Sequence, residues 1–260
     1  MITGISSACF YPAPTEEAVA HLVSLDCPNI EIFLNSFSEL RPEFVSSLRS
    51  LLAGSGTRVV SLHPFTSGME GMLFFSDYDR RFWDGVELYK RYLEIALELE
   101  GRYVVFHGAH KMANLDRELY AQRYGILHEE AKKAGGLLLH ENVERSVSRD
   151  PGFFRYLGEQ IPDAGFVLDV KQAIRAEEDP LEMLDAMAGH LRHVHISDNA
   201  PGQPCLAVGG GTMDMAAFLR ALRSRGYDEA LILELYSSNY ETDRELTDSL
   251  KILDELLEKG

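Results

Sequence analysis

The chain lacks the features that mark secreted and membrane proteins. Its three cysteines, Cys9, Cys27 and Cys205, are far apart and include no CxxC pair, so they indicate neither a disulfide framework nor a thiolate zinc site. No apolar run approaches the roughly 18 to 20 residues that a membrane helix needs. The first residues have the pattern of a strand rather than of a secretory signal. We therefore expect a cytoplasmic protein with no membrane contact.

Basic residues are also scarce. The chain has 25 Lys and Arg against 41 Asp and Glu, which gives a formal net charge of −16, and consecutive basic residues occur at most in pairs such as Lys132-Lys133. Nucleic-acid binding depends on clustered cations that release counterions from phosphates, and a strongly acidic protein repels polyanions at long range. The composition therefore predicts no nucleic-acid partner and favours a small-molecule substrate.

What the chain does contain is a regular alternation of short apolar strands and longer helical segments. Hydrophobic residues make up 45% of the 260 residues, which suits one globular domain over residues 1–260. Asp150-Pro151 and Asp179-Pro180 mark two helix starts, because each places an N-cap aspartate before a proline at the first helical position. Eight strands are predicted, each followed by a helical segment: residues 2–6, 29–33, 57–62, 102–107, 136–141, 165–169, 192–197 and 230–236.

This alternation predicts a single-domain α/β fold, a (β/α)8 TIM barrel. Parallel neighbours need crossover connections, and the length of the chain allows eight βα units of about 32 residues. An open doubly wound sheet is the rival fold, but it usually has a Gly-rich fingerprint after its first strand. Ser6-Ser7-Ala8-Cys9-Phe10 stands there instead. The longest insertion, residues 65–76, is rich in Gly, Met and Phe, and is either a lid over the mouth of the barrel or a packed loop.

Ionisable side chains stand at the carboxyl ends of seven of the eight predicted strands. In a (β/α)8 barrel these ends form the mouth, where active sites lie. An apolar strand such as Leu137-Leu138-Leu139-His140-Glu141 has no structural reason to finish in a buried carboxylate, because an unpaired charge out of water costs several kcal/mol. The seven residues are Glu31, His63, His107, Glu141, Asp169, His195 and Glu234.

A bound cation removes the cost of burying these carboxylates. We predict that Glu141, Asp169, His195 and Glu234 hold one divalent ion, Mn²⁺, Co²⁺, Zn²⁺ or Mg²⁺. The alternative is that salt bridges with basic residues neutralise the carboxylates, and the candidates for these bridges are Lys171, Arg102 and Arg192.

Other residues near these strand ends are candidates for substrate contact. His63 and His107 follow adjacent strands and are suited to a substrate hydroxyl or to a second metal, and we favour the substrate. Gln172 is suited to a sugar hydroxyl or ring oxygen. Lys171 either reaches a carboxylate or phosphate of the substrate or lies on the surface. His193, two residues before His195 and one layer deeper, is expected to be structural.

The strand-end motifs, in their order along the chain, resemble the xylose-isomerase-like barrel superfamily. This group includes sugar phosphate isomerases and epimerases, inosose isomerase and dehydratase, 3-dehydroshikimate dehydratase and endonuclease IV. The motifs are Val105-Phe106-His107-Gly108, Leu139-His140-Glu141-Asn142, Val167-Leu168-Asp169, His193-Val194-His195-Ile196-Ser197-Asp198 and Leu233-Glu234.

The resemblance implies that Glu141, Asp169, His195 and Glu234 are metal ligands, as in the ketose epimerases, and that Glu141 and Glu234 also move the catalytic proton. It implies a divalent-metal-dependent isomerase or epimerase that acts on a sugar, sugar phosphate or inosose through an enediolate. No organic cofactor is needed, and assembly into a homo-oligomer is left open.

Two alternatives belong to the same superfamily. A dehydratase of a keto-polyol or keto acid would use the same metal and the same proton abstraction. An endonuclease IV-like phosphodiesterase is the less favoured alternative, because two of that family's motifs are altered. Gln172 stands where Asp-x-x-His would place a second histidine, and Gln203-Pro204-Cys205 replaces an Asp-x-His pair.

Overall fold

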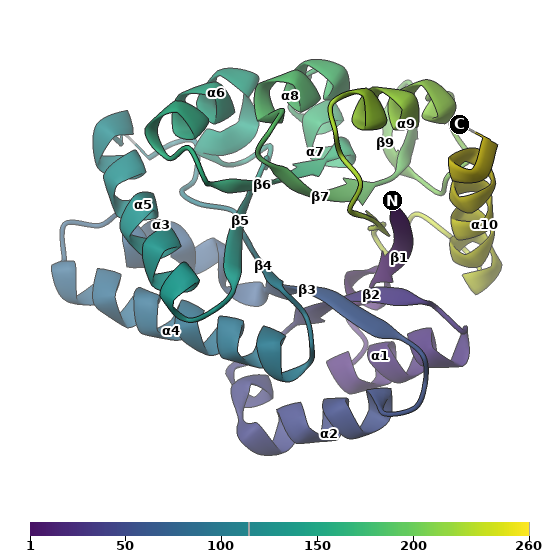
Figure 1. Ribbon diagram of the computed structural model, residues 1–260, viewed down its shortest axis with the longest axis horizontal. Coiled ribbons are helices and arrows are strands. Elements are labelled where there is room, and N and C mark those ends of the chain that lie inside the picture. The colour runs from purple at the N-terminus through teal and green to yellow at the C-terminus, as the bar shows by residue number, and fades with distance from the viewer. Residues whose placement is uncertain (114, 260) are drawn as a thin grey trace.

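Eight parallel strands close into a barrel, which confirms the predicted fold. The computed structural model describes residues 1–113 and 115–259, so the last residue of the predicted domain, 260, lies outside the described residues. The strands follow one another around the barrel in the order β1-β10-β7-β6-β5-β4-β3-β2, seen along the barrel axis in Figure 1. Their bounds are β1 Ile2–Ser6, β2 Asn29–Leu34, β3 Arg58–Pro64, β4 Tyr103–Phe106, β5 Leu137–Glu141, β6 Gly165–Asp169, β7 Leu191–Ile196 and β10 Ala230–Leu233.

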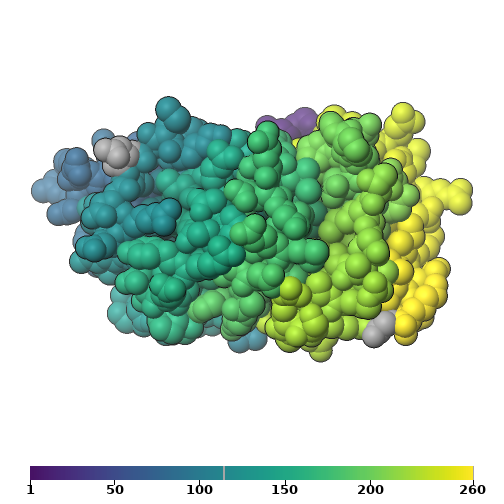
Figure 2. All heavy atoms as spheres, turned by 90° about the horizontal axis from the view of Figure 1, so that it is seen from above, coloured from purple at the N-terminus to yellow at the C-terminus, as the bar shows by residue number. Residues whose placement is uncertain are grey.

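Helices cover the outside of the barrel in chain order (Figure 1). Figure 2 shows part of this wall from the side, where the colour runs from blue-green to yellow across one face. No helix in the described residues has both the length and the apolar character to cross a membrane. The helices are α1 Thr15–Ser24, α2 Pro42–Leu52, α3 Glu70–Phe74, α4 Asp79–Glu98, α5 Arg117–Lys133, α6 Pro151–Gln160, α7 Val170–Arg175, α8 Pro180–Met187, α9 Met215–Ser224 and α10 Asp243–Lys259, with short 3₁₀ turns η1 Ser7–Phe10, η2 Phe37–Leu40, η3 Phe65–Met69 and η4 Val147–Arg149.

Local capping signals place two of these helices as predicted. The Asp150 side chain accepts a hydrogen bond from the Phe153 N–H at 3.1 Å, and α6 begins at the following proline. Asp179 caps α8 in the same way through the Leu181 N–H at 2.9 Å. Proline lacks a backbone N–H, but at the first helical position an N–H would have no partner within the helix. The two helices therefore start at these prolines at little cost.

The strand ends differ from prediction by a few residues. β4 was expected to reach residue 107 but ends at Phe106, because the chain then turns at Gly108, whose φ is +81°. β10 was expected to reach residue 236 but its ladder with β7 ends at Leu233. The sequence also missed a short antiparallel hairpin, β8 Asp198–Ala200 with β9 Gln203–Leu206. These boundaries depend on neighbouring strands and loops rather than on local pattern.

The strands are apolar along most of their length because both of their faces are buried. Outward-facing side chains pack against the helices in one large core. Inside the barrel Tyr103, Val105, Leu139 and Val167 form a separate cluster. The barrel is therefore a filled core, and polar chemistry is confined to its ends.

The insertion at residues 65–76 is folded against the body of the protein. It forms η3 and α3, and Phe74 is 1% exposed. The ring centroid of Phe74 lies 5.2 Å from that of Tyr89 in α4 and 5.5 Å from that of Phe106 in β4. Of the two interpretations of this segment, the structure favours the packed one.

Gly4 in β1 gives a test of this packing. A Cβ at Gly4 would lie 2.3 Å from the Asn29 carbonyl oxygen and 2.7 Å from Ile232 Cδ1. Gly4→Ala should therefore lower the free energy of unfolding by about 1–3 kcal/mol, measured by urea denaturation. Gly68→Ala is the matched control, since a Cβ at that position meets no atom within 4 Å. Equal unfolding midpoints for the two variants would contradict the packing described here.

Candidate metal centre

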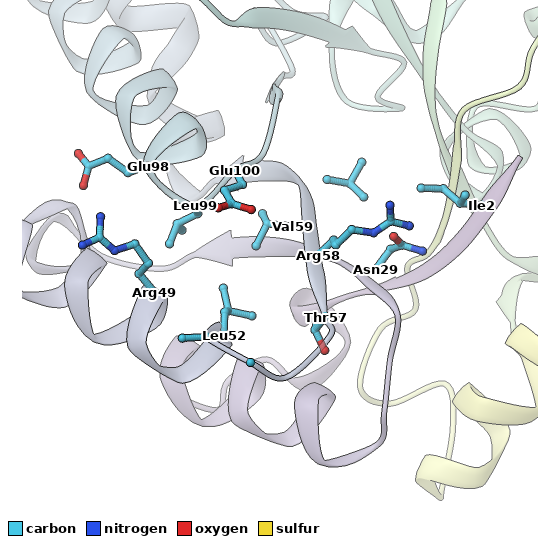
Figure 3. Close-up of a pocket in the computed structure, with 13 residues that line it drawn as sticks. Ile2, Asn29, Arg49, Leu52, Thr57, Arg58, Val59, Glu98, Leu99 and Glu100 are labelled. Atoms are coloured by element: carbon cyan, nitrogen blue, oxygen red, sulfur yellow. The ribbon is translucent and has the colours of Figure 1, made fainter.

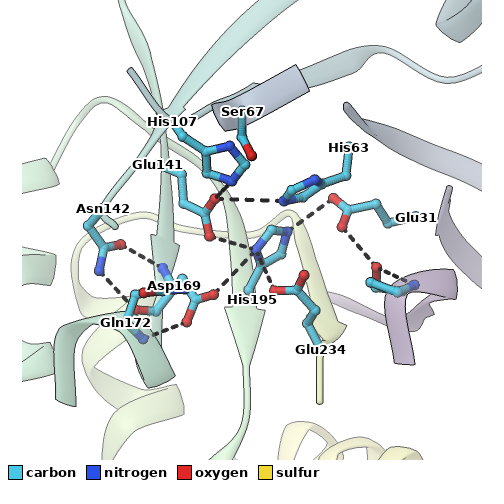
Figure 4. A network of polar contacts seen from close by, with 12 residues as sticks. Glu31, His63, Ser67, His107, Glu141, Asn142, Asp169, Gln172, His195 and Glu234 are labelled. Carbon is cyan, nitrogen blue, oxygen red and sulfur yellow. Dashed lines mark hydrogen bonds and ion pairs between the residues drawn. The ribbon is translucent and has the colours of Figure 1, made fainter. Parts of the chain in front are cut away.

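The ionisable side chains predicted at strand ends meet at one end of the barrel (Figure 4). They fall into overlapping groups whose potential ligand atoms lie within 4.8 Å of one another. Glu31 lies inside β2, but the stagger of the strands sets it opposite Ser6, the last residue of β1. The groups are Glu31-His193-His195, His63-His107-Glu141 and Glu141-Asp169-His195-Glu234.

The four predicted metal ligands form one of these groups, and they come from four adjacent strands, β5, β6, β7 and β10. His195 Nδ1 lies 3.2 Å from Glu141 Oε1, 3.2 Å from Glu234 Oε2 and 3.7 Å from Asp169 Oδ2. Donor atoms that share an ion at about 2.0–2.3 Å are separated by similar distances. Glu141, Asp169 and His195 are buried, and the Glu234 side chain is 11% exposed.

Asp169 is held in place by its position between a strand and a helix. As the last residue of β6 and the N-cap of α7, it accepts the Gln172 N–H at Oδ1 over 2.9 Å, which leaves Oδ2 to face His195. Asn142, just after β5, bonds the Asp169 backbone on both sides: its Nδ2 donates to the Asp169 carbonyl at 2.9 Å and its Oδ1 accepts the Asp169 N–H at 2.7 Å. The ends of β5 and β6 are therefore locked together.

Glu31 orients the imidazole of His195 from behind. Its Oε2 contacts His195 Nε2 at 3.0 Å and His193 Nε2 at 3.2 Å, and accepts the Ser61 hydroxyl at 2.8 Å. A carboxylate that accepts the Nε2–H of a histidine fixes the ring and leaves Nδ1 free to bind a metal. The sequence placed Glu31 at a strand end but predicted no role for it. His193 is fully buried against Glu31.

His63 and His107 flank the other oxygen of Glu141. His107 Nε2 lies 2.7 Å and His63 Nε2 3.8 Å from Glu141 Oε2, and the two ring centroids are 4.7 Å apart. Glu141 Oε2 is buried and has no hydrogen bond of regular geometry, and neither do His63 Nδ1 and His107 Nδ1. The two partners predicted for His63 and His107, a substrate hydroxyl and a second ion, would bind beside Glu141 Oε2.

Lys171 and Gln172 both contact other residues of the chain. Lys171 is 3% exposed, so the expectation of a surface lysine is wrong. Its ammonium pairs with Asp169 Oδ2 and Glu234 Oε2. Gln172 Oε1 accepts the Glu144 N–H at 3.2 Å, so part of its side chain serves to hold the loop after β5.

The salt-bridge alternative proposed from the sequence therefore applies to Lys171 alone of the three candidates. Arg192 donates to the Gly189 carbonyl at 3.2 Å and to the Leu191 carbonyl at 2.8 Å. Arg102 lies over the ring of Tyr103, 5.7 Å from its centroid. Both arginines stand next to the amino-terminal ends of their strands, far from the carboxylates at the mouth.

Glu70 is a buried acid that sequence reasoning missed. It begins α3, is fully buried, and its Oε2 accepts the His107 N–H at 2.9 Å together with the Gly108 N–H. It also accepts the Tyr89 hydroxyl. Burial raises the pKa of Glu70 to about 8. The only local signal was one acid within the apolar run of residues 65–76, and this acid fixes the backbone that carries His107.

Burial and opposite charge act against each other in the ligand group. Burial raises the pKa of Asp169 to about 6. Burial disfavours the charged ring of His195, but the carboxylates of Glu31 and Glu234 outweigh it and hold the pKa of His195 well above its ordinary value. Burial also disfavours the Glu141 carboxylate, whose histidine neighbours nevertheless hold its pKa well below its ordinary value. Protonated His195 therefore supplies positive charge among the carboxylates.

These residues fit a divalent ion. Three carboxylates and one imidazole form a ligand set that Mn²⁺, Co²⁺ and Zn²⁺ all accept. Their donor atoms converge within 4.8 Å. An ion that takes Nδ1 of His195 replaces the proton that the carboxylates otherwise require.

Hollows lie at both ends of the barrel, and they differ in chemistry. The one at the mouth, of about 220 Å³, is lined by Lys171 and Glu234 with an apolar wall of Tyr11, Phe33 and Tyr236. The other, of about 480 Å³, lies where β1, β2 and β3 begin (Figure 3). Its charged residues are Arg49 of helix α2, Arg58 at the start of β3, and Glu98 and Glu100 at and just after the end of α4. No cluster of ligating side chains faces this hollow in the described residues. The mouth is therefore the candidate site.

Solved structures with the same fold cover nearly the whole chain. A D-tagatose 3-epimerase-like protein is 22% identical with a TM-score of 0.80, over 99% of this chain and 97% of that one. The 3-keto-D-glucoside 4-epimerase YcjR from E. coli is 19% identical with a TM-score of 0.75, over 98% of each chain. The IOLI protein, solved with a bound zinc atom, is 17% identical with a TM-score of 0.80, over 100% and 99%.

A direct search of curated proteins finds no match. The sequence profile of one family, however, spans almost all of the chain, from residue 19 to residue 256. The match includes all four predicted metal ligands as well as His63 and His107. The chain therefore belongs to the xylose isomerase-like TIM barrel family.

Proposed function

We propose that the protein is a divalent-metal-dependent isomerase or epimerase of a small polyhydroxylated carbonyl compound, such as a sugar, a sugar phosphate or an inosose. The observation that carries the proposal is the convergence of Glu141 and Glu234 with Asp169 and His195 at the mouth of the barrel. Glu141 ends β5 and Glu234 follows β10, so the two glutamates approach the same point from different strands.

Proton transfer is assigned to Glu141 and Glu234. One glutamate takes the proton from the carbon next to the substrate carbonyl, and the other returns a proton to the enediolate from another side. Asp169, His195 and the two glutamates would hold the ion, which when bound polarises the carbonyl and offsets negative charge on its oxygen. His63 and His107, whose Nε2 atoms lie beside Glu141 Oε2, are assigned to the substrate hydroxyls.

The proposed substrate class is supported by the side chains at the mouth and by solved structures with the same fold. The hollow there, of about 220 Å³, combines Glu234 and Lys171 with aromatic rings from Tyr11, Phe33 and Tyr236, a combination that suits the mixed polar and C–H faces of a sugar. Two solved structures with this fold are a D-tagatose 3-epimerase-like protein and a 3-keto-D-glucoside 4-epimerase. Gln172 and Lys171 are assigned to substrate contact on the side of the site next to Asp169.

Metal content is the first test. The purified protein should take up one tightly held divalent ion per chain, and the IOLI protein with its zinc atom supports this expectation. Because the ligands must be deprotonated, uptake should release protons near pH 7 from His195. Affinity should therefore already fall as the pH drops through 7, and more steeply below about 6, the pKa of Asp169. Elemental analysis and calorimetry in two buffers of different ionisation enthalpy measure these effects. A stoichiometry near zero after incubation with Mn²⁺, Co²⁺ or Zn²⁺ would refute the metal centre.

Glu31 gives a second test, because it orients His195 without belonging to the ligand set. Glu31→Gln should weaken Mn²⁺ binding by about 10- to 100-fold, since the amide cannot accept from both histidines and both serines. Competition with a fluorescent chelator measures the dissociation constant. Glu39→Gln, which alters a hydrogen-bonded carboxylate in the loop after β2, should leave it unchanged. Equal affinities for the two variants would remove Glu31 from the metal centre.

Proton transfer is the third test. With a substrate found by screening ketoses, inososes and keto acids in D₂O, the wild type should exchange the hydrogen next to the carbonyl, observed by NMR. Glu234→Gln keeps one ligand oxygen, so it should slow this exchange by about 10²- to 10⁴-fold while metal content is retained. Glu241→Gln, an exposed acid in the same connection to α10, is the control.

The products separate the two enzyme classes that share this chemistry. An isomer or epimer has the mass of the substrate, whereas a dehydratase product is lighter by one water. Near-normal exchange in Glu234→Gln or Glu141→Gln with the metal bound would make that glutamate a ligand only. The base would then have to be sought at His63, His107 or Lys171.

A further inference from the structure

Lys171 joins two of the proposed metal ligands from the side. Its ammonium donates to Asp169 Oδ2 and Glu234 Oε2, and the Lys171 side chain is 4% exposed. The same two oxygens face Nδ1 of His195, at 3.7 and 3.2 Å. The lysine therefore shares ligand oxygens with the proposed ion (the two carboxylates are seen in Figure 4).

The ammonium nevertheless does not stand where the ion would. An ion bound to all four ligands lies about 2.0–2.3 Å from an oxygen of Glu141. In the described part of the chain Lys171 pairs within 4.0 Å with Asp169 and Glu234 but not with Glu141. The ammonium therefore does not coincide with the position of an ion bound to all four ligands, although both would contact Asp169 and Glu234.

The charges of the centre leave a place for one monovalent cation. Glu141, Asp169 and Glu234 contribute three negative charges, and a divalent ion with a neutral His195 offsets two of them. Within this ligand set one negative charge is left, while Glu31, outside the set, contacts His193 and His195. A buried charge without a partner is costly. Lys171 supplies that partner, and in the metal-free protein it is the permanent cation against Asp169 and Glu234.

We propose that Lys171 is a built-in cation of the metal centre that limits how tightly the divalent ion is held. It keeps Asp169 and Glu234 together when no ion is present, and it completes the charge balance when one is. Because ammonium and ion carry like charges and share two oxygens, each weakens the hold of the other. The part of this inference that concerns the ion rests on the proposed function.

Three variants test the role of Lys171, with Mn²⁺ alone as the probe. Lys171→Met should melt on the order of 10 °C below the wild type after removal of metal by a chelator, because two buried carboxylates lose one of the two cations, Lys171 and His195, that face them. It should also bind Mn²⁺ about ten-fold or more tightly. Lys171→Arg keeps the charge and should stay near the wild type in both measurements. Lys111→Met removes a charge from the partly exposed pair with Glu144 and should change neither.

The outcomes separate this inference from the proposed function. Mn²⁺ binding of equal or lower affinity in Lys171→Met, or a metal-free melting temperature no lower than that of Lys111→Met, would overturn the role of Lys171 while leaving the metal centre in place. Failure of the wild type and of every variant to bind Mn²⁺, Co²⁺ or Zn²⁺ would instead overturn the metal-dependent function, and with it the effect of Lys171 on the ion. Tighter Mn²⁺ binding together with a lower metal-free melting temperature supports the inference.

Discussion

The structure depends on one electrostatic constraint, which is the burial of four carboxylates at one end of an apolar barrel. Glu31, Glu141 and Asp169 are at most 2% exposed, and the Glu234 side chain is 11% exposed. Each charge needs a partner that does not come from water. Glu31 accepts hydrogen bonds from the hydroxyls of Ser6 and Ser61 and contacts the rings of His193 and His195. The other three carboxylates all face His195, and Asp169 and Glu234 also pair with Lys171. Their oxygens also fit the coordination of a divalent ion.

The barrel meets this constraint through its geometry. Parallel strands send all their carboxyl ends to the same side, so residues far apart in the chain converge there without long loops. Neighbouring side chains fix each position: Asn142 holds the Asp169 backbone, Glu31 holds the His195 ring, and Glu70 holds the backbone of the turn that carries His107. Such support fixes the ring and carboxylate orientations without an ion.

The barrel and the meeting of the strand-end residues, among them the four proposed ligands, could be predicted because their signals are local: an apolar run, then an ionisable side chain at its end. The partners of those residues could not, because they depend on contacts between distant segments. Glu31 meets His195 from 164 positions away, and the burial of Lys171 results from Glu234, 63 positions further on. Glu70 lies in an insertion whose packing on α4 has no periodic pattern. The β8–β9 hairpin and the early end of β10 likewise follow from neighbouring strands.

The barrel closes by pairing its first strand with its last, and this pairing bears on how the protein is made. β1 pairs with β10 over Ile2 to Ile5, and the residue after β10 is Glu234, so both the closure of the barrel and the completion of the ligand set wait for the last strand. A chain emerging from the ribosome, amino terminus first, carries Glu141, Asp169 and His195 well before Glu234 exists. Under the proposed function, the complete set of metal ligands would therefore form only when synthesis of the last strand is finished.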